Sequence, residues 1–270
     1  MSIEVQRGDR TLVVHDDGAG ETALLWHIGS PQTGALLAPV LEAARARGIR
    51  LISYGRPGYG GSTANRGRDV ASAALDVEAI VDHLGVDTFA TMGASGGGPH
   101  ALACAALLPG RVTAVATLAS LAPYSPESWW VDGMQAPGGI LSALSGRQAR
   151  ASFAETDEFD PEQFIAADLA MFDGPWSALG EDVAASEQWG DDGLIDDDVA
   201  FTKAWGFDPG AVAAPTLLLH GHLDRVVPVA HSEWMARHVP RSELVVHPGD
   251  GHIAILREVP AAMDWLLAAQ

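Results

Sequence analysis

Short apolar runs alternate with amphipathic or alanine-rich segments along most of the chain. The apolar, β-rich runs predict strands over residues 11–15, 23–28, 50–54, 88–92, 112–118, 215–220 and 243–247. The segments between them predict helices over residues 34–47, 69–84, 96–108, 229–238 and 253–269. Strands that alternate with helices in this way indicate a mostly parallel sheet covered by helices on both faces. We therefore predict an α/β fold.

The alternation stops between residues 123 and 208. In this segment the β-rich runs disappear, about half of all Asp and Glu residues accumulate, and most of the tryptophans occur. Its aromatic residues recur at loosely helical spacings among the acids. We predict a core formed by residues 1–122 and 209–270 and a helical insertion, the cap segment, formed by residues 123–208. The aromatics would pack this insertion and the acids would face solvent.

Charge and composition exclude several classes of partner. The 270 residues include 16 Lys and Arg against 35 Asp and Glu, a formal net charge of −19, which argues against nucleic acid or an anionic membrane surface. No apolar run is long enough to cross a bilayer, and the first residues lack a signal-peptide pattern, so we expect a cytoplasmic protein. The single cysteine, Cys104, excludes an internal disulfide and a cysteine-based metal cluster. A homo-oligomer remains compatible with these numbers.

The candidate nucleophile is Ser95, within Gly93-Ala94-Ser95-Gly96-Gly97. This string follows a predicted strand and precedes a predicted helix, which is the context that a Gly-x-Ser-x-Gly nucleophile elbow requires. Small neighbours let the strand and the helix approach each other at such a turn. The backbone N–H of Gly96 and the start of the helix would then face an oxyanion that forms nearby.

A candidate acid and base follow further along the chain. Asp224 lies four residues after the strand predicted at 215–220, and His252 lies in the turn 249–252 after the last predicted strand. Carboxyl ends of parallel strands share one edge of a sheet, so Ser95, Asp224 and His252 are expected to meet there. Asp250 competes for the acid role, but side chains so close in a turn rarely point at each other, which favours Asp224.

A metal site is a second interpretation of this region. His220, His222 and Asp224 supply ligand types for a metal ion. Their position at the end of a strand, with Asp224 needed elsewhere, favours the acid loop. We predict no metal and no other cofactor.

Three further motifs carry a resemblance to a known family: the turn Gly29-Ser30-Pro31, the glycine-rich stretch 54–62, and Gly96-Gly97-Gly98-Pro99-His100. With the Ser, Asp, His order, they make the sequence similar to the α/β-hydrolase superfamily along essentially its whole length. The closest resemblance is to lid-bearing serine hydrolases of actinobacterial type. Two positions depart from that pattern: Ile28 stands where a second histidine or a glycine is common, and Gly55 where an aspartate often precedes Arg-Pro-Gly.

The resemblance implies a function for each of these residues. Ser95 would be the nucleophile, His252 the general base and then acid, and Asp224 the partner that orients the imidazole. The backbone N–H groups of Ser30 and Gly96 would form the oxyanion hole. Trp129 and Trp130, where the cap segment leaves the core, are candidates for the wall of the substrate pocket.

The predicted function is that of a cofactor-free, carboxylesterase-like serine hydrolase. Its substrate would be a small molecule with an ester, thioester, lactone or amide bond. The same triad also supports perhydrolysis, as in cofactor-free haloperoxidases, and carbon–carbon bond cleavage. A ligand-binding sensor with slow turnover is an alternative from a different class. The carboxylate-nucleophile branch of the fold is excluded because position 95 is a serine.

Overall fold

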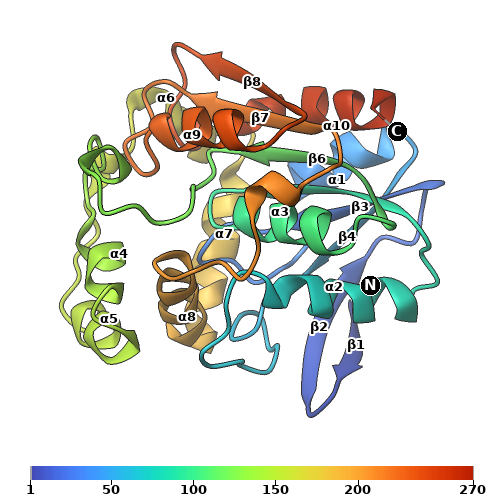
Figure 1. The fold of residues 1–270 in the computed structure, drawn as a ribbon, viewed down its shortest axis with the longest axis horizontal. Helices are drawn as coiled ribbons and strands as arrows, with labels where there is room; N and C mark the ends of the chain where they lie inside the picture. Colours follow the sequence, from blue (N-terminus) through green and yellow to red (C-terminus); the bar gives the residue numbers. More distant parts are fainter. Residues whose placement is uncertain (1, 270) are drawn as a thin grey trace.

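A computed structural model describes residues 2–269 and has the predicted α/β architecture (Figure 1). Its sheet has the strand order β1-β2-β4-β3-β5-β6-β7-β8. The strands are β1 (Ser2–Arg7), β2 (Arg10–Asp16), β3 (Thr22–His27), β4 (Ile49–Tyr54), β5 (Phe89–Ala94), β6 (Val112–Leu118), β7 (Thr216–Gly221) and β8 (Ser242–His247). Pairing is antiparallel between β1 and β2 and between β2 and β4, and parallel from β4 to β8.

Helices cover both faces of the sheet. One face packs against α1 (Ala38–Arg45) and α10 (Val259–Ala268), the other against α2 (Ser72–His83), α3 (Gly97–Leu107) and α9 (Ala230–His238). Successive strand residues serve opposite faces: Leu24 and Trp26 are buried on the side of α1, and Leu25 on the side of α3. The period of two therefore builds two cores from the same buried strands.

Two local features differ from the predicted elements. Strand β1 was not predicted, because it is an edge strand in which only Val5 is buried and its apolar pattern is correspondingly weak. The helix expected over 253–269 divides into a 3-10 helix (Ala254–Glu258) and α10. Pro260 explains this division, since proline lacks an N–H and is tolerated in the first turn of a helix but not in its interior.

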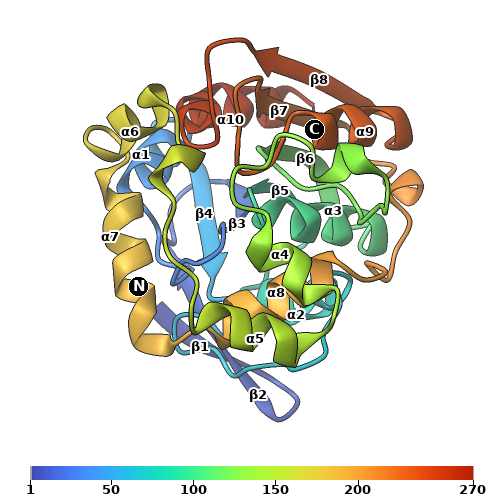
Figure 2. The same ribbon diagram turned by 90° about the vertical axis from the view of Figure 1, so that its left-hand side faces the viewer.

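The cap segment forms helices between β6 and β7. They are α4 (Gly138–Ala143), α5 (Arg147–Ala154), α6 (Ala166–Phe172), α7 (Ser177–Ser186) and α8 (Asp192–Phe201). The segment leaves the sheet at the carboxyl end of β6, so it covers the edge where the parallel strands end. Figure 2 faces this side and shows α6 and α7 to one side of the sheet edge and α4, α5 and α8 below it.

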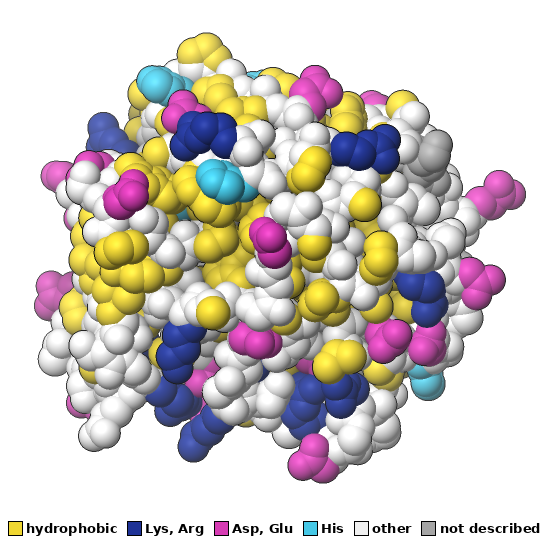
Figure 3. Space-filling view, in the orientation of Figure 1, with side chains coloured by type: hydrophobic (Ala, Val, Ile, Leu, Met, Phe, Trp, Pro, Cys, Tyr) yellow, Lys and Arg dark blue, Asp and Glu magenta, His cyan; other side chains and the backbone are white. Residues whose placement is uncertain are grey.

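The acids of the cap segment are not all solvated, contrary to the expectation from composition. Asp168, Asp182 and Asp197 are each at most 8% exposed. On the face that Figure 3 shows, acidic side chains are dispersed rather than gathered in one patch. Between residues 2 and 269, every helix is too short or too polar to cross a membrane.

Candidate active site

Ser95 lies on a tight turn between β5 and α3. It has a φ of 51°, in the left-handed region that non-glycine residues rarely adopt. The turn is held by two backbone hydrogen bonds: the Ser95 N–H donates to the Leu118 carbonyl at 2.8 Å, and the Ser95 carbonyl accepts from the Gly98 N–H at 3.1 Å. Strain of this kind persists only where the surroundings enforce it, and it is common at functional sites.

The glycines around Ser95 allow close backbone approach. A Cβ on Gly93 would collide with the backbone of Gly97, and a Cβ on Gly97 would collide with the carbonyls of His27 and Ile28. A Cβ on Gly98 would overlap the side chain of Ser120. The run of glycines therefore brings the start of α3 against the ends of β3 and β6, which raises the serine above the sheet edge.

The structure brings Ser95, His252 and Asp224 into one hydrogen-bonded chain. His252 Nε2 lies 3.0 Å from Ser95 Oγ, and His252 Nδ1 lies 2.8 Å from Asp224 Oδ2. The second oxygen of Asp224 accepts the N–H groups of Val226 at 2.8 Å and Val227 at 2.9 Å, which fixes the carboxylate. A base within reach of a nucleophile, itself oriented by an acid, is the arrangement that activates a serine hydroxyl.

Electrostatics favour an ion pair between His252 and Asp224. Burial raises the pKa of the Asp224 carboxyl, but the charge on His252 and a hydrogen bond from His220 outweigh it and hold that pKa well below its usual range. Burial also opposes the charge on His252, yet the neighbouring Asp224 carboxylate raises the pKa of His252 above its ordinary value. The site therefore favours a charged imidazolium at His252, next to Ser95.

Asp250, the other candidate for the acid, and His220, a candidate metal ligand, are in contact with other groups. The Asp250 carboxylate lies 2.8 Å from Arg257 Nη2 and 3.5 Å from His247, rather than against His252. The ring nitrogens of His220 lie 2.6 Å from Ser232 Oγ and 2.7 Å from the Val227 carbonyl. His220 thus helps to hold the loop that carries Asp224.

Ser30 and Gly96 lie side by side next to Ser95. A Cβ on Gly96 would lie 2.7 Å from Ser30 Oγ, so the two residues are direct neighbours. Within residues 2–269, no acceptor is hydrogen-bonded to the backbone N–H of Ser30 or of Gly96. Two unpaired N–H groups next to a nucleophile can stabilise a developing oxyanion.

A buried carboxylate of the cap segment holds the Ser30 turn in place. Asp197 on α8 accepts the Ser30 hydroxyl at 2.8 Å and ion pairs with Arg56 and with Arg68 at 2.6 Å each. Tyr59 donates its hydroxyl to the same carboxylate at 2.9 Å. Burial alone would raise the pKa of Asp197, but the two guanidinium groups outweigh it and hold that pKa well below its usual range. The glycine-rich stretch 54–62 thus supplies partners for the cap segment.

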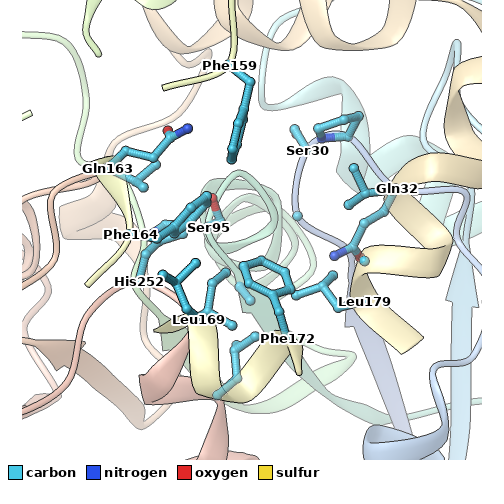
Figure 4. A pocket seen from close by; sticks show the side chains of 18 residues that line it. Ser30, Gln32, Ser95, Phe159, Gln163, Phe164, Leu169, Phe172, Leu179 and His252 are labelled. Atoms are coloured by element: carbon cyan, nitrogen blue, oxygen red, sulfur yellow. The ribbon is translucent and has the colours of Figure 1, made fainter. Parts of the chain in front are cut away.

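A cavity of about 640 Å³ opens above Ser95 (Figure 4). Its walls are mostly apolar, and the cap segment contributes Phe164, Leu169, Phe172 and Leu179 around Ser95. Phe159, which is 72% exposed, lies at the edge of this cavity. Among the described residues that line it, none is Lys, Arg, Asp or Glu.

Trp129 and Trp130 do not line this cavity, contrary to the prediction. The Trp130 indole is buried, donates to the Ala122 carbonyl at 3.1 Å and packs edge-on against His231 of α9. Trp129 stacks on Trp234 of the same helix. Both tryptophans therefore attach the start of the cap segment to the core, and the aromatic walls come from residues further along the segment.

Two more carboxylates of the cap segment hold loops at the site, and sequence reasoning missed both. Asp168 on α6 is fully buried and accepts the N–H groups of Ile253 at 2.8 Å and Ala254 at 2.7 Å, directly after His252. Asp182 on α7 accepts the N–H of Thr33 at 3.0 Å and also its hydroxyl. Sequence offers little sign of these contacts, since Asp168 and Ile253 are 85 positions apart.

The chain is similar to known proteins along most of its length. The chain is 28% identical over 265 residues to a non-heme haloperoxidase of Rhodococcus erythropolis, covering 92% of each protein. It is also 28% identical to a pimeloyl-[acyl-carrier protein] methyl ester esterase of Nitrosomonas europaea, covering 80% of this chain and 83% of that protein. The solved structure of a bromoperoxidase from Bacillus anthracis superposes with a TM-score of 0.75 at 22% identity, covering 99% of this chain and 98% of the other.

The family assignment rests on a match that spans most of the chain. Residues 18–259 match the family model described as alpha/beta hydrolase fold. This range includes the parallel strands, the turn that carries Ser95 and the loops that carry Asp224 and His252. The chain therefore belongs to the alpha/beta hydrolase fold family.

Proposed function

We propose that this protein is a serine hydrolase that cleaves an ester-type bond through an acyl-enzyme. The observation that carries the proposal is the hydrogen-bonded chain from Ser95 through His252 to Asp224, at the base of a mostly apolar cavity. The family match and the esterase among the relatives support a hydrolase.

The mechanism follows from the positions of these groups. His252 Nε2 takes the proton of the Ser95 hydroxyl as Ser95 Oγ bonds to the carbonyl carbon of the ester. The carbonyl oxygen becomes an oxyanion that accepts the N–H groups of Gly96 and Ser30, and loss of one such donor typically costs about 2.7–4 kcal/mol. The intermediate collapses to an acyl-Ser95, and His252 gives its proton to the departing alcohol. Water then attacks the acyl group by the same route and releases the acid.

The cavity favours a substrate whose larger group is apolar and uncharged. Its aromatic and aliphatic walls offer no ion-pair partner for a charged group, and burying an unpaired charge is costly. A cavity of about 640 Å³ is within the range of small-molecule sites. Alcohols leave more readily than amines, so esters are the first substrates to test.

The decisive experiment is covalent labelling with a fluorophosphonate probe. We expect rapid labelling of Ser95, confirmed by peptide mass spectrometry, and no labelling of the Ser95→Ala variant. A panel of p-nitrophenyl esters of increasing acyl length then measures the depth of the cavity. A folded protein that is not labelled would contradict the proposal and would favour a ligand-binding sensor.

Perhydrolysis is a second candidate, favoured by the haloperoxidase relative, which aligns over 92% of both chains. In this reaction hydrogen peroxide replaces water as the attacking group, so the acyl-Ser95 is released as a peracid. We would measure bromide oxidation in acetate buffer with hydrogen peroxide, using Ser95→Ala as the control. Ester hydrolysis without peracid formation would exclude this candidate.

A further inference from the structure

Gln32 is a buried amide next to the candidate nucleophile. It follows the Ser30 turn and lines the same cavity as Ser95 (Figure 4). A Cβ built on Gly29 would lie 3.5 Å from Gln32 Nε2 and 3.6 Å from Ser95 Cβ, so the amide and the serine flank one methyl-sized space. A substrate carbonyl bound at Ser95 would bring its neighbouring atoms close to this amide.

The amide oxygen of Gln32 is buried and has no hydrogen-bond partner within residues 2–269. The side chain is 8% exposed, and its Oε1 is buried without a donor. Burying an amide without a partner costs about 1–3 kcal/mol. This cost is removed only if a molecule other than the protein forms hydrogen bonds with the amide.

The loop that carries Gln32 is held rigidly. The next residue, Thr33, donates its backbone N–H and its hydroxyl to Asp182 of α7, and the Thr33 hydroxyl oxygen accepts the Ala35 N–H at 3.1 Å. Ser30, two positions earlier, is bound by Asp197 and Arg56. Because both flanks are fixed, the backbone of Gln32 is held next to Ser95.

We infer that Gln32 binds a neutral polar group of the substrate, close to the scissile bond. This inference rests on the proposed hydrolase function and narrows it: the natural substrate is an ester with an apolar body and a hydroxyl, carbonyl or amide near the ester group. An amide both donates and accepts, so it recognises any of these groups. The remaining walls are mostly apolar, which makes Gln32 the residue that selects among esters of similar size.

The test compares pairs of esters in which a hydroxyl replaces a terminal methyl. On the acyl side the pair is p-nitrophenyl butyrate and p-nitrophenyl 3-hydroxypropanoate; on the alcohol side it is propyl butyrate and 2-hydroxyethyl butyrate. For each pair we measure the ratio of kcat/KM for the hydroxyl ester to that for the methyl ester, divided by the ratio of their spontaneous hydrolysis rates. We expect a ratio above unity in at least one pair.

The variant Gln32→Met has nearly the same length but no hydrogen-bonding group. It should lower the favoured ratio by about tenfold, the effect of one lost hydrogen bond to a buried partner. The matched control is Gln163→Met, at the other glutamine of the cavity wall, which should change both esters of a pair alike. If turnover is too slow to follow, the same esters are compared as competitors of fluorophosphonate labelling.

The outcomes separate this inference from the proposed function. Labelling of Ser95 with equal ratios in the wild type and Gln32→Met, for both pairs, would overturn the role of Gln32 and leave the hydrolase intact. Equal effects of Gln32→Met and Gln163→Met would also overturn it. Failure to label Ser95 would instead contradict the hydrolase proposal itself.

Discussion

Replacing Asp168 tests whether the cap segment holds the His252 loop in its working position. The Asp168 carboxylate accepts three backbone N–H groups: Ile253 at 2.8 Å, Ala254 at 2.7 Å and Ile165 at 3.0 Å. Hydrogen bonds to a charged group contribute about 1.5–3 kcal/mol each, although bonds that share one acceptor are not additive. We therefore expect Asp168→Ala to lower the free energy of unfolding by about 3–5 kcal/mol.

The conservative variant Asp168→Asn separates position from charge. Its Oδ1 can still accept the N–H groups of Ile253 and Ala254, so we expect a smaller loss, about 1–2 kcal/mol. Burial lowers the pKa of His252, and the Asp224 carboxylate raises it. The Asp168 charge also raises this pKa, with a smaller effect. The proposed mechanism requires neutral His252, so removing this charge should move the acid limb of the kcat/KM profile to lower pH.

Urea unfolding and pH–rate profiles provide the two measurements. The matched control is Asp173→Ala, an exposed acid at the other end of the same helix. If Asp168→Ala were no less stable than Asp173→Ala, Asp168 would not hold the loop. A rate loss in Asp168→Asn without a shift of the acid limb would assign Asp168 a purely structural role.

Three further predictions follow from the described contacts. Asp224→Asn should lower kcat by about 10⁴-fold, because an amide favours the wrong tautomer of His252; an unchanged kcat with p-nitrophenyl esters would remove Asp224 from the triad. Burial lowers the pKa of His231 to about 4, so the unfolded chain takes up this proton first as pH falls. Stability should therefore be full above pH ~6.5 and fall by about 3 kcal/mol by pH 4, and His231→Gln should flatten that slope in urea titrations. Gly97→Ala should cost about 1–3 kcal/mol by calorimetry, because its methyl group would meet the His27 and Ile28 carbonyls; a wild-type Tm would contradict this packing.

The core and the candidate triad were predictable because their signals are local. Apolar runs identified seven of the strands of the described sheet, and Ser95, Asp224 and His252 each follow a strand within a few residues. The sheet then places them together without further information. Strand β1 was not predicted, because an edge strand with one buried residue has no strong apolar pattern.

The cap segment was predictable only in outline, because its contacts join distant parts of the sequence. Its acidic residues cannot be distinguished by residue type alone, yet Asp168 is buried against the His252 loop while Asp173 is exposed. The aromatic residues raised the same difficulty: Trp129 and Trp130 pack against α9, whereas Phe164 and Phe172 line the cavity. Only the tertiary fold distinguishes members of each set.

Three buried carboxylates of the cap segment that bind the core, Asp168, Asp182 and Asp197, also limit how this protein can be re-engineered. Asp182 and Asp197 bind loops that precede Ser95 in the chain, whereas Asp168 binds a loop near the carboxyl terminus. The cap segment therefore joins two parts of the core that are far apart in sequence. A chimera that exchanges residues 123–208 for a foreign cap would leave Arg56 and Arg68 as buried, unpaired charges and free the His252 loop. New specificity is more safely sought by changing wall residues of the cavity one at a time.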